Sequence, residues 1–283
     1  MNLYNETKFL INKYNVTAKK SLGQNFLIDE NVILDAINAA NITKEDIVIE
    51  IGPGLGTLTK YLLDRAKKVI CVELDNSMIN ILKERFFLYE NFEVINDDIL
   101  KIDLNELISK NKSELKVDNV KIVANLPYYI TTPIIMRLLE ERLDINSITV
   151  MIQKEVADRL TAIPGNKNTG AITYSVYYYA VAETIKNVPN TSFVPEPNVE
   201  SEVIKLTIRK NPVIEVKDEE KLFRLIKVAF MQRRKTLINA VSNSDLVEKD
   251  EIKQILNQLN IDERIRGENL SLEDFAKIAD KID

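Results

Sequence analysis

The segment Glu50-Ile51-Gly52-Pro53-Gly54-Leu55-Gly56 constrains the fold more than any other part of this chain. Its three glycines follow an apolar stretch and precede an amphipathic one, so they allow a tight turn between a strand and a helix. In such a turn the backbone amides can approach a ligand closely. The segment therefore predicts an α/β fold with a nucleoside-binding loop between a strand and the helix that follows it.

Short apolar segments alternate with amphipathic ones over residues 29–152. Nearly all-apolar strands separated by helices indicate a parallel sheet that is covered on both faces. A sheet of this kind binds ligands outside the carboxyl ends of its strands. The expected strands are 47–51, 69–73, 92–95, 122–124 and 148–152. The expected helices are 58–64, 78–87, 133–141 and one that begins after an N-cap at Asp29.

Two further strands are expected at 183–188 and 202–209. A late hairpin at the sheet edge is typical of methyltransferases that use S-adenosylmethionine (SAM) and is not expected of dinucleotide-binding domains. Residues 218–283 show only helical periodicity, so Asn211-Pro212 marks a domain boundary. The predicted fold class is α/β, with a Rossmann-like class I SAM-dependent methyltransferase sheet in residues 1–211 and a small all-helical domain in residues 212–283.

The chain of 283 residues contains no histidine and one cysteine, Cys71. These absences exclude a Ser-His or Cys-His catalytic pair, a histidine metal site and a disulfide framework, and no metal is expected. No apolar run approaches the ~20 residues of a membrane span, and the polar, mobile N-terminal tail lacks the features of a signal peptide. We expect a cytoplasmic monomer without membrane contact. The net charge of −5 argues mildly against a nucleic acid partner, although phosphate binding depends on local charge.

Acidic residues follow successive predicted strands. Glu73 ends the second strand about 20 positions after Gly52, where an acid can accept hydrogen bonds from both ribose hydroxyls of a nucleoside. These two features alone fit NAD and SAM about equally. Asp98, with Asp97 as the competing candidate, follows the third strand and can hold the exocyclic amine of a cofactor's adenine. Three acids after three successive strands fit a cofactor with a cationic sulfonium better than they fit a pyrophosphate.

The segment Asn125-Leu126-Pro127-Tyr128 ends the fourth predicted strand. The adenine amine is a poor nucleophile because its lone pair is delocalised, and two hydrogen-bond acceptors would favour a pyramidal nitrogen. Asn125 can supply a side-chain oxygen, the backbone carbonyl before Tyr128 can supply the second acceptor, and Pro127 stiffens the turn. Tyr128 offers a face on which the base can stack. Phe193 is either the second half of a stacking clamp or a hydrophobic plug under its loop.

These motifs resemble those of the small-subunit ribosomal RNA adenine dimethyltransferases of the KsgA type, and the resemblance runs from residue 19 to about residue 240. The matching segments are Gly23-Gln24-Asn25-Phe26-Leu27, Glu50-Ile51-Gly52-Pro53-Gly54, Val72-Glu73-Leu74-Asp75, Asn125-Leu126-Pro127-Tyr128, Gln153-Lys154-Glu155-Val156, Phe193-Val194-Pro195-Glu196-Pro197 and Gln232-Arg233-Arg234-Lys235-Thr236. The resemblance implies SAM-dependent dimethylation of two adjacent adenines in a 16S rRNA 3′-end hairpin loop. It implies 16S rRNA within the small ribosomal subunit or its precursor as the partner.

The resemblance also implies site residues. Its cofactor contacts fall on Asn25, Leu27, Gly52, Glu73, Asp98 and Asn125, to which the glycine loop adds Gly54. Basic residues are candidates for RNA contact, and they are Lys154 with Arg159 and the run Arg233, Arg234 and Lys235. A further basic pair, Lys19-Lys20, is more typical of a solvated face.

Three other functions compete with this interpretation. The related 23S rRNA methyltransferase of the macrolide-resistance type is disfavoured by Gln232-Arg233-Arg234-Lys235-Thr236 and the helical tail. A non-catalytic ribosome assembly factor would not need Asn125 or an intact glycine loop. An NAD-dependent oxidoreductase would leave the segment 125–128 without a role.

Overall fold

The computed structural model of the chain describes residues 2–19, 22–166 and 168–282. The described residues form two compact units, one within residues 1–157 and 182–208 and one within residues 158–181 and 209–283. The division at 208–209 lies close to the predicted boundary. The prediction differs from the structure in one respect, because residues 158–181 belong to the second unit and not to the first.

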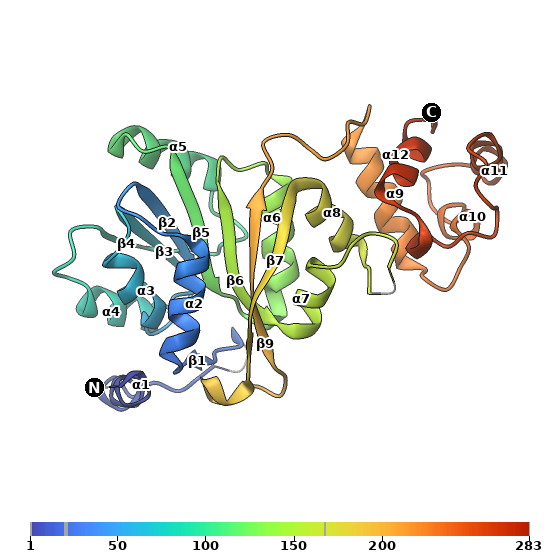
Figure 1. Cartoon of the computed structure of the whole chain (residues 1–283). Coiled ribbons are helices and arrows are strands. Elements are labelled where there is room, and N and C mark those ends of the chain that lie inside the picture. Colours follow the sequence, from blue (N-terminus) through green and yellow to red (C-terminus); the bar gives the residue numbers. More distant parts are fainter. Residues whose placement is uncertain (1, 20–21, 167, 283) are drawn as a thin grey trace. The chain divides into compact units, whose positions relative to one another are not determined.

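The first unit is built on a twisted sheet (Figure 1). In the described part of the chain this sheet has seven strands in the order β4-β3-β2-β5-β6-β9-β7. β2 to β6 pair in parallel with their neighbours, whereas β9 runs antiparallel to β6. All the predicted strands are present, and their bounds are β2 Asp46–Ile51, β3 Lys68–Glu73, β4 Phe92–Asn96, β5 Asn119–Asn125, β6 Ser147–Gln153, β7 Ala180–Val188 and β9 Ser201–Ile208.

Helices cover this sheet, and the predicted ones are α2 Glu30–Ala40, α3 Thr57–Leu63, α4 Asn76–Arg85 and α6 Thr131–Glu140. Asp29 caps α2 as expected, since its side chain accepts a hydrogen bond from the Asn31 amide. Among the helices that were not predicted are α5 Leu104–Leu115 and α7 Lys154–Leu160. Buried apolar side chains of α2 and α3 pack with those of β2 and β3 into one core cluster.

The N-terminal residues form a helix, α1 (Leu3–Lys13), and not the mobile tail that was predicted. Its buried residues are Leu3, Thr7 and Leu10, which lie on one face of the helix. Glu6 pairs with Arg85 at 2.7 Å and with Lys60 at 3.2 Å. Tertiary contacts therefore stabilise this helix.

In the described part of residues 218–283 the regular elements are all helical, as predicted. The helices of the second unit are α8 Ala171–Tyr179, α9 Glu219–Met231, α10 Leu237–Val241, α11 Lys249–Gln258 and α12 Leu272–Ala279. α8 was not predicted. The ring of Tyr174 lies 5.4 Å from that of Phe230 and 5.2 Å from that of Phe275, and its hydroxyl donates to the Leu270 carbonyl. These contacts place α8 with the C-terminal helices. Within the described residues, no helix is both long and apolar enough to cross a membrane.

One carboxyl group is buried inside the sheet. Glu50 on β2 is 1 % exposed, and the thiol of the equally buried Cys71 lies 3.5 Å from its Oε2. Burial raises the pKa of Glu50 to about 7, because hydrogen bonds with Thr59 and Cys71 only partly offset the cost of burying the charge and Glu73 adds repulsion.

This raised pKa predicts a pH-dependent loss of stability. Between pH 4.5 and about 7 the unfolded chain releases the Glu50 proton while the folded chain retains it, so the stability falls as pH rises through that window. Glu50→Gln removes the effect. We expect the free energy of unfolding of the variant, relative to the parent, to rise by on the order of 3 kcal/mol between pH 4.5 and pH 8.

Urea denaturation of the cofactor-free protein at the two pH values provides the measurement. Comparing the same variant at two pH values cancels any pH-independent effect of the amide. Glu90→Gln, which removes an exposed carboxylate, controls for the loss of one charge. An equal stability difference between Glu50→Gln and parent at both pH values would contradict the prediction.

Candidate active site

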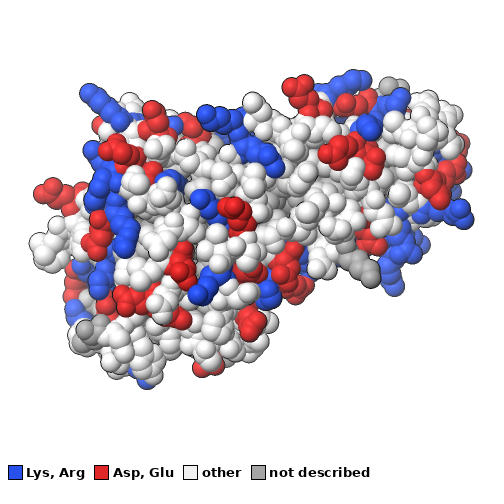
Figure 2. Space-filling model, viewed as in Figure 1, with Lys and Arg blue, Asp and Glu red and all other residues white. Residues whose placement is uncertain are grey.

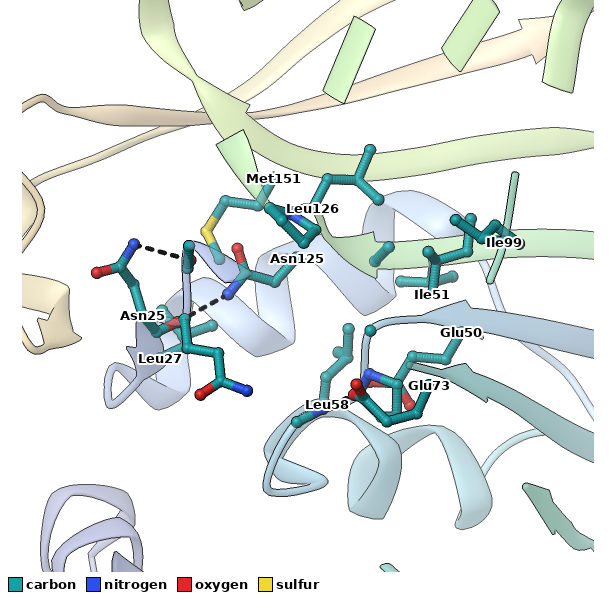
Figure 3. A pocket seen from close by; sticks show the side chains of 18 of the residues that line it. Asn25, Leu27, Glu50, Ile51, Leu58, Glu73, Ile99, Asn125, Leu126 and Met151 are labelled. Atoms are coloured by element: carbon teal, nitrogen blue, oxygen red, sulfur yellow. Dashed lines mark hydrogen bonds between the residues drawn. The ribbon is translucent and has the colours of Figure 1, made fainter. Parts of the chain in front are cut away.

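A pocket opens at the carboxyl ends of β2 to β6, and every residue that lines it belongs to the first unit. The sequence-predicted site residues that line it are Asn25, Leu27, Gly52, Gly54, Glu73, Asp97, Asp98, Asn125, Pro127 and Tyr128. In Figure 3, Asn25 and Asn125 lie together on one side of the pocket, and Glu73 lies near Glu50 on the other. The topology brings these residues together because carboxyl ends of parallel strands meet at one edge of the sheet.

The glycine loop turns tightly between β2 and α3. Gly54 has a φ of 56° and Gly56 a φ of 78°, conformations that residues with a side chain rarely adopt. A Cβ atom on Gly56 would lie 2.5 Å from the Phe86 ring, so α3 can approach α4 only with glycine at this position. The amide of Gly54 donates to Glu73 Oε2 at 3.1 Å. The loop is thus fixed by the same acid that was predicted to bind a ribose.

Glu73 ends β3 and is buried. Its Oε1 accepts a hydrogen bond from the Asp75 amide at 2.8 Å, and its Oε2 accepts the one from Gly54. Burial raises the pKa of Glu73, although these backbone hydrogen bonds oppose the shift. Each carboxylate oxygen can accept a further hydrogen bond, so Glu73 is positioned to bind two hydroxyls in the pocket.

A buried carboxylate also holds the N-terminal loop beside the pocket. Asp75 caps α4 and accepts hydrogen bonds from Lys19 Nζ at 2.8 Å and Gln24 Nε2 at 3.1 Å. Burial alone would raise the pKa of Asp75, but the hydrogen bonds from Lys19, Ser77 and Gln24 together lower it to about 2. Lys19 is therefore tied into the fold, whereas Lys20 lies outside the described residues.

The N-terminal loop determines the orientation of the Asn125 side chain. Asn125 Nδ2 donates to the backbone carbonyl of Asn25 at 3.2 Å, and Asn25 Nδ2 donates to the carbonyl of Gly23 at 3.2 Å (Figure 3). A carbonyl can only accept, so the amide nitrogen of Asn125 must face Asn25. Its Oδ1 is consequently left as an acceptor at the pocket, which is the orientation that the sequence analysis required.

The second predicted acceptor is corrected by the structure. The backbone carbonyl before Tyr128 is that of Pro127, and it already accepts hydrogen bonds from Thr131 Oγ1 at 2.9 Å and from the Ile130 amide at 3.3 Å. These bonds form the short helical turn Tyr128–Ile130. Among the described residues, none donates a hydrogen bond to the carbonyl of Leu126, the preceding residue and another member of the pocket lining. Leu126 is therefore the better source of a second acceptor.

The two predicted stacking residues differ in their surroundings. Tyr128 lines the pocket half-buried, and its hydroxyl lies 2.6 Å from Ser201 Oγ; burial raises the pKa of this phenol. Phe193 is 1 % exposed, pairs with Leu27 in a two-stranded sheet of β1 (Phe26–Leu27) and β8 (Phe193–Val194), and packs in the core. Phe193 does not line the pocket. The structure thus favours the hydrophobic plug over the clamp.

Both candidates for the cofactor's adenine amine reach the pocket lining. Asp97 is exposed, and its Oδ1 accepts a hydrogen bond from the Asp98 amide at 2.7 Å. Asp98 is less exposed, and its Oδ1 accepts from the Leu100 amide at 3.0 Å. The greater burial of Asp98 favours it as the residue that recognises a base.

The predicted RNA-contacting residues do not gather at the pocket lining. Lys154 belongs to the first unit, where it contacts Asn187 and Glu202, and Arg159 is exposed in the second unit. Arg233 pairs with Glu268 at 3.3 Å, while Arg234 and Lys235 are exposed between α9 and α10. On the face drawn in Figure 2, basic side chains are interspersed with acidic ones.

Comparisons with known proteins identify the family. The model of the family Ribosomal RNA adenine dimethylase matches residues 15–283. A Ribosomal RNA small subunit methyltransferase A of Clostridioides difficile (strain 630) is 48% identical over 279 residues, which cover 99% of this chain and 96% of the relative. One of Clostridium botulinum is 49% identical over 276 residues, with 98% of each chain covered.

Solved structures agree with this result. A dimethyladenosine transferase from Plasmodium falciparum has a TM-score of 0.73 and 29% identity, covering 89% of this chain and 95% of that one. The 23S rRNA methyltransferase ErmE has a TM-score of 0.67 and 23% identity, covering 91% and 99%, and shows the fold alone. The predicted class I methyltransferase fold and the predicted enzyme class, a SAM-dependent rRNA adenine methyltransferase, are confirmed. The chain belongs to the ribosomal RNA adenine dimethylase family.

Proposed function

We propose that this protein transfers methyl groups from SAM to the exocyclic amines of two adjacent adenines in a 16S rRNA hairpin loop near the 3′ end, during maturation of the small ribosomal subunit. Membership of the rRNA adenine dimethylase family supports the reaction. The substrate follows from curated relatives of 47% identity or more that are named for the small subunit. The solved 23S enzyme is more distant in sequence and supports no role in the large subunit.

The observation that carries the proposal is the fixed amide of Asn125. Its nitrogen is held by the Asn25 carbonyl, so its oxygen is available to accept one hydrogen of an adenine amine. The Leu126 carbonyl accepts the other. Pro127 and the turn held by Thr131 keep the backbone rigid. Tyr128 supplies the aromatic face, and its hydroxyl contact with Ser201 fixes the ring.

The pocket fits SAM in its polar groups. The glycine loop and Glu73 would hold the ribose, Asp98 the adenine amine, and Asn25, Leu27 and Asn125 the remainder of the cofactor. SAM supplies a methyl group on a sulfonium that is already a good leaving group. The protein therefore acts by positioning and electrostatics, which fits a chain without histidine.

The second unit and the basic residues complete the proposal. Arg233, Arg234 and Lys235, together with Lys154 and Arg159, contact the RNA backbone, and residues 212–283 dock on the ribosomal subunit. The protein acts as a monomer in the cytoplasm, where it meets the subunit or its precursor.

The test of this function uses radiolabelled SAM and small subunits that lack the 3′-end adenine methylation. Nucleoside analysis is expected to show N6-dimethyladenosine that approaches four methyl groups per subunit. Incorporation into the large subunit alone, or SAM binding without transfer, would contradict the proposal.

Removing the Asn125 side chain is expected to abolish most of the activity. Asn125→Ala deletes one acceptor of the amine, and the loss of one preorganised hydrogen-bond partner of a reacting group lowers turnover by about 10²- to 10³-fold. Turnover is measured with saturating SAM, and melting followed by circular dichroism checks the fold. Asn119→Ala, at the exposed opposite end of β5, is the matched control. Turnover near that of the control would exclude Asn125 from the mechanism.

Removing the Glu73 carboxylate is expected to weaken SAM binding. Glu73→Ala eliminates charge-assisted hydrogen bonds to the ribose, so the dissociation constant rises by about 10- to 100-fold. Titration calorimetry gives this constant directly. Glu93→Ala on the neighbouring strand β4, outside the pocket, controls for the loss of a carboxylate. Unchanged affinity in Glu73→Ala would remove the ribose assignment.

A further inference from the structure

Tyr129 is an aromatic residue at the pocket that the proposed reaction does not yet use. It lines the pocket directly after Tyr128, yet 53 % of it is exposed. Within the described part of the chain, its hydroxyl has no hydrogen-bond partner. Tyr128 differs on both counts, since it is less exposed and its hydroxyl is held by Ser201. The ring of Tyr129 therefore meets solvent at the edge of the pocket.

The position of Tyr129 is fixed by the residues around it. Its backbone lies in the turn that the Pro127 carbonyl holds through Thr131 Oγ1 and the Ile130 amide. Its ring edge packs on Gly23, where a Cβ atom would lie 3.4 Å from Tyr129 Cδ1. That distance is an ordinary van der Waals contact, and it is the φ of 59° at Gly23 that favours glycine there. An aromatic ring held in this way is preorganised to receive a flat partner.

We propose that Tyr129 stacks on the base next to the target adenine and so forms a second base subsite of the enzyme. This inference rests on the proposed function and extends it. An adenine whose amine reaches Asn125 must leave the base stack of its RNA, and its neighbour then loses a stacking partner. The exposed ring of Tyr129, adjacent in sequence to the residue that holds the target base, replaces that partner. Aromatic stacking suits this role because it tolerates any base.

Two adjacent adenines give this subsite a further use. While one adenine occupies the pocket, the other is the neighbouring base that Tyr129 holds. When the bases exchange places, the same ring receives the adenine that has been methylated. A single aromatic platform thus serves both target positions without base-specific hydrogen bonds.

The first test compares substitutions of Tyr129 in methylation of small subunits that lack the modification. Tyr129→Phe keeps the stacking face and is expected to retain the kcat/KM of the parent. Tyr129→Leu keeps apolar bulk but no ring, and it should lower kcat/KM for the subunit by about 5- to 150-fold. The dissociation constant of SAM should stay unchanged in both variants. Phe87→Leu, at a ring that is 75 % exposed and outside the pocket, is the control and should leave kcat/KM unchanged.

The second test identifies the base that the ring touches. In subunits whose neighbouring adenine is replaced by uracil, a weaker stacking base, the penalty of Tyr129→Leu at the remaining adenine should shrink at least about threefold. The chain has no tryptophan, so Tyr129→Trp also introduces a single tryptophan, whose emission can be excited selectively. The tryptophan emission of Tyr129→Trp should be quenched when the subunit binds. The emission of Phe87→Trp should not be quenched.

The outcomes separate this inference from the function on which it rests. A parent enzyme that transfers no methyl groups to the subunit would contradict the proposed function. With an active parent, equal kcat/KM for Tyr129→Leu and Tyr129→Phe would show that no ring is needed. An undiminished penalty with the uracil substrate would mean that Tyr129 does not stack on the neighbouring base. Either of these results overturns the inference alone.

Discussion

The buried carboxylate of Asp75 is the contact on which the geometry of the site depends. It caps α4, and it also holds Lys19 and Gln24 of the N-terminal loop. Its pKa of about 2 keeps it charged throughout the physiological pH range, so this attachment does not loosen with pH. The loop that it holds presents the Asn25 carbonyl to Asn125. The segment that follows β3, the strand that carries the acid proposed to bind the cofactor, thus also fixes the orientation of the amide that is proposed to act on the substrate.

Much of the fold could be predicted because its signals are local. The strands of the sheet are short apolar runs, and the helix after Asp29 has both a cap and an apolar face. Four of the described helices were not predicted, and two of them, α1 and α8, show why. α1 is held by Glu6 and two buried leucines, and α8 contains tyrosines and β-branched residues that favour strands. Both helices are stabilised by partners distant in sequence, which periodicity does not reveal.

The part of the site that depends only on topology could be predicted from the sequence. Gly52, Glu73 and Asn125 follow from the rule that strand ends meet at one edge of the sheet. The orientation of individual groups could not be predicted from topology. Packing decides whether the Pro127 carbonyl already accepts a hydrogen bond within the protein. It also decides whether Phe193 is buried in the core. Gln24 was part of a matching segment, but nothing in the sequence indicated its hydrogen bond to Asp75. Nothing in the sequence indicated the contact between Ser201 and Tyr128 either.

The groups proposed to hold the adenine amine are an amide oxygen and a backbone carbonyl, and neither titrates. As the bond to the methyl group forms, positive charge grows on the amine nitrogen, and two fixed acceptors stabilise it more than they stabilise the neutral amine. This requires acceptors that are held in place before the substrate arrives. The Asn25 carbonyl and the turn after Pro127 provide that restraint. A rigid arrangement of neutral oxygens can therefore assist methyl transfer in a chain that has no histidine.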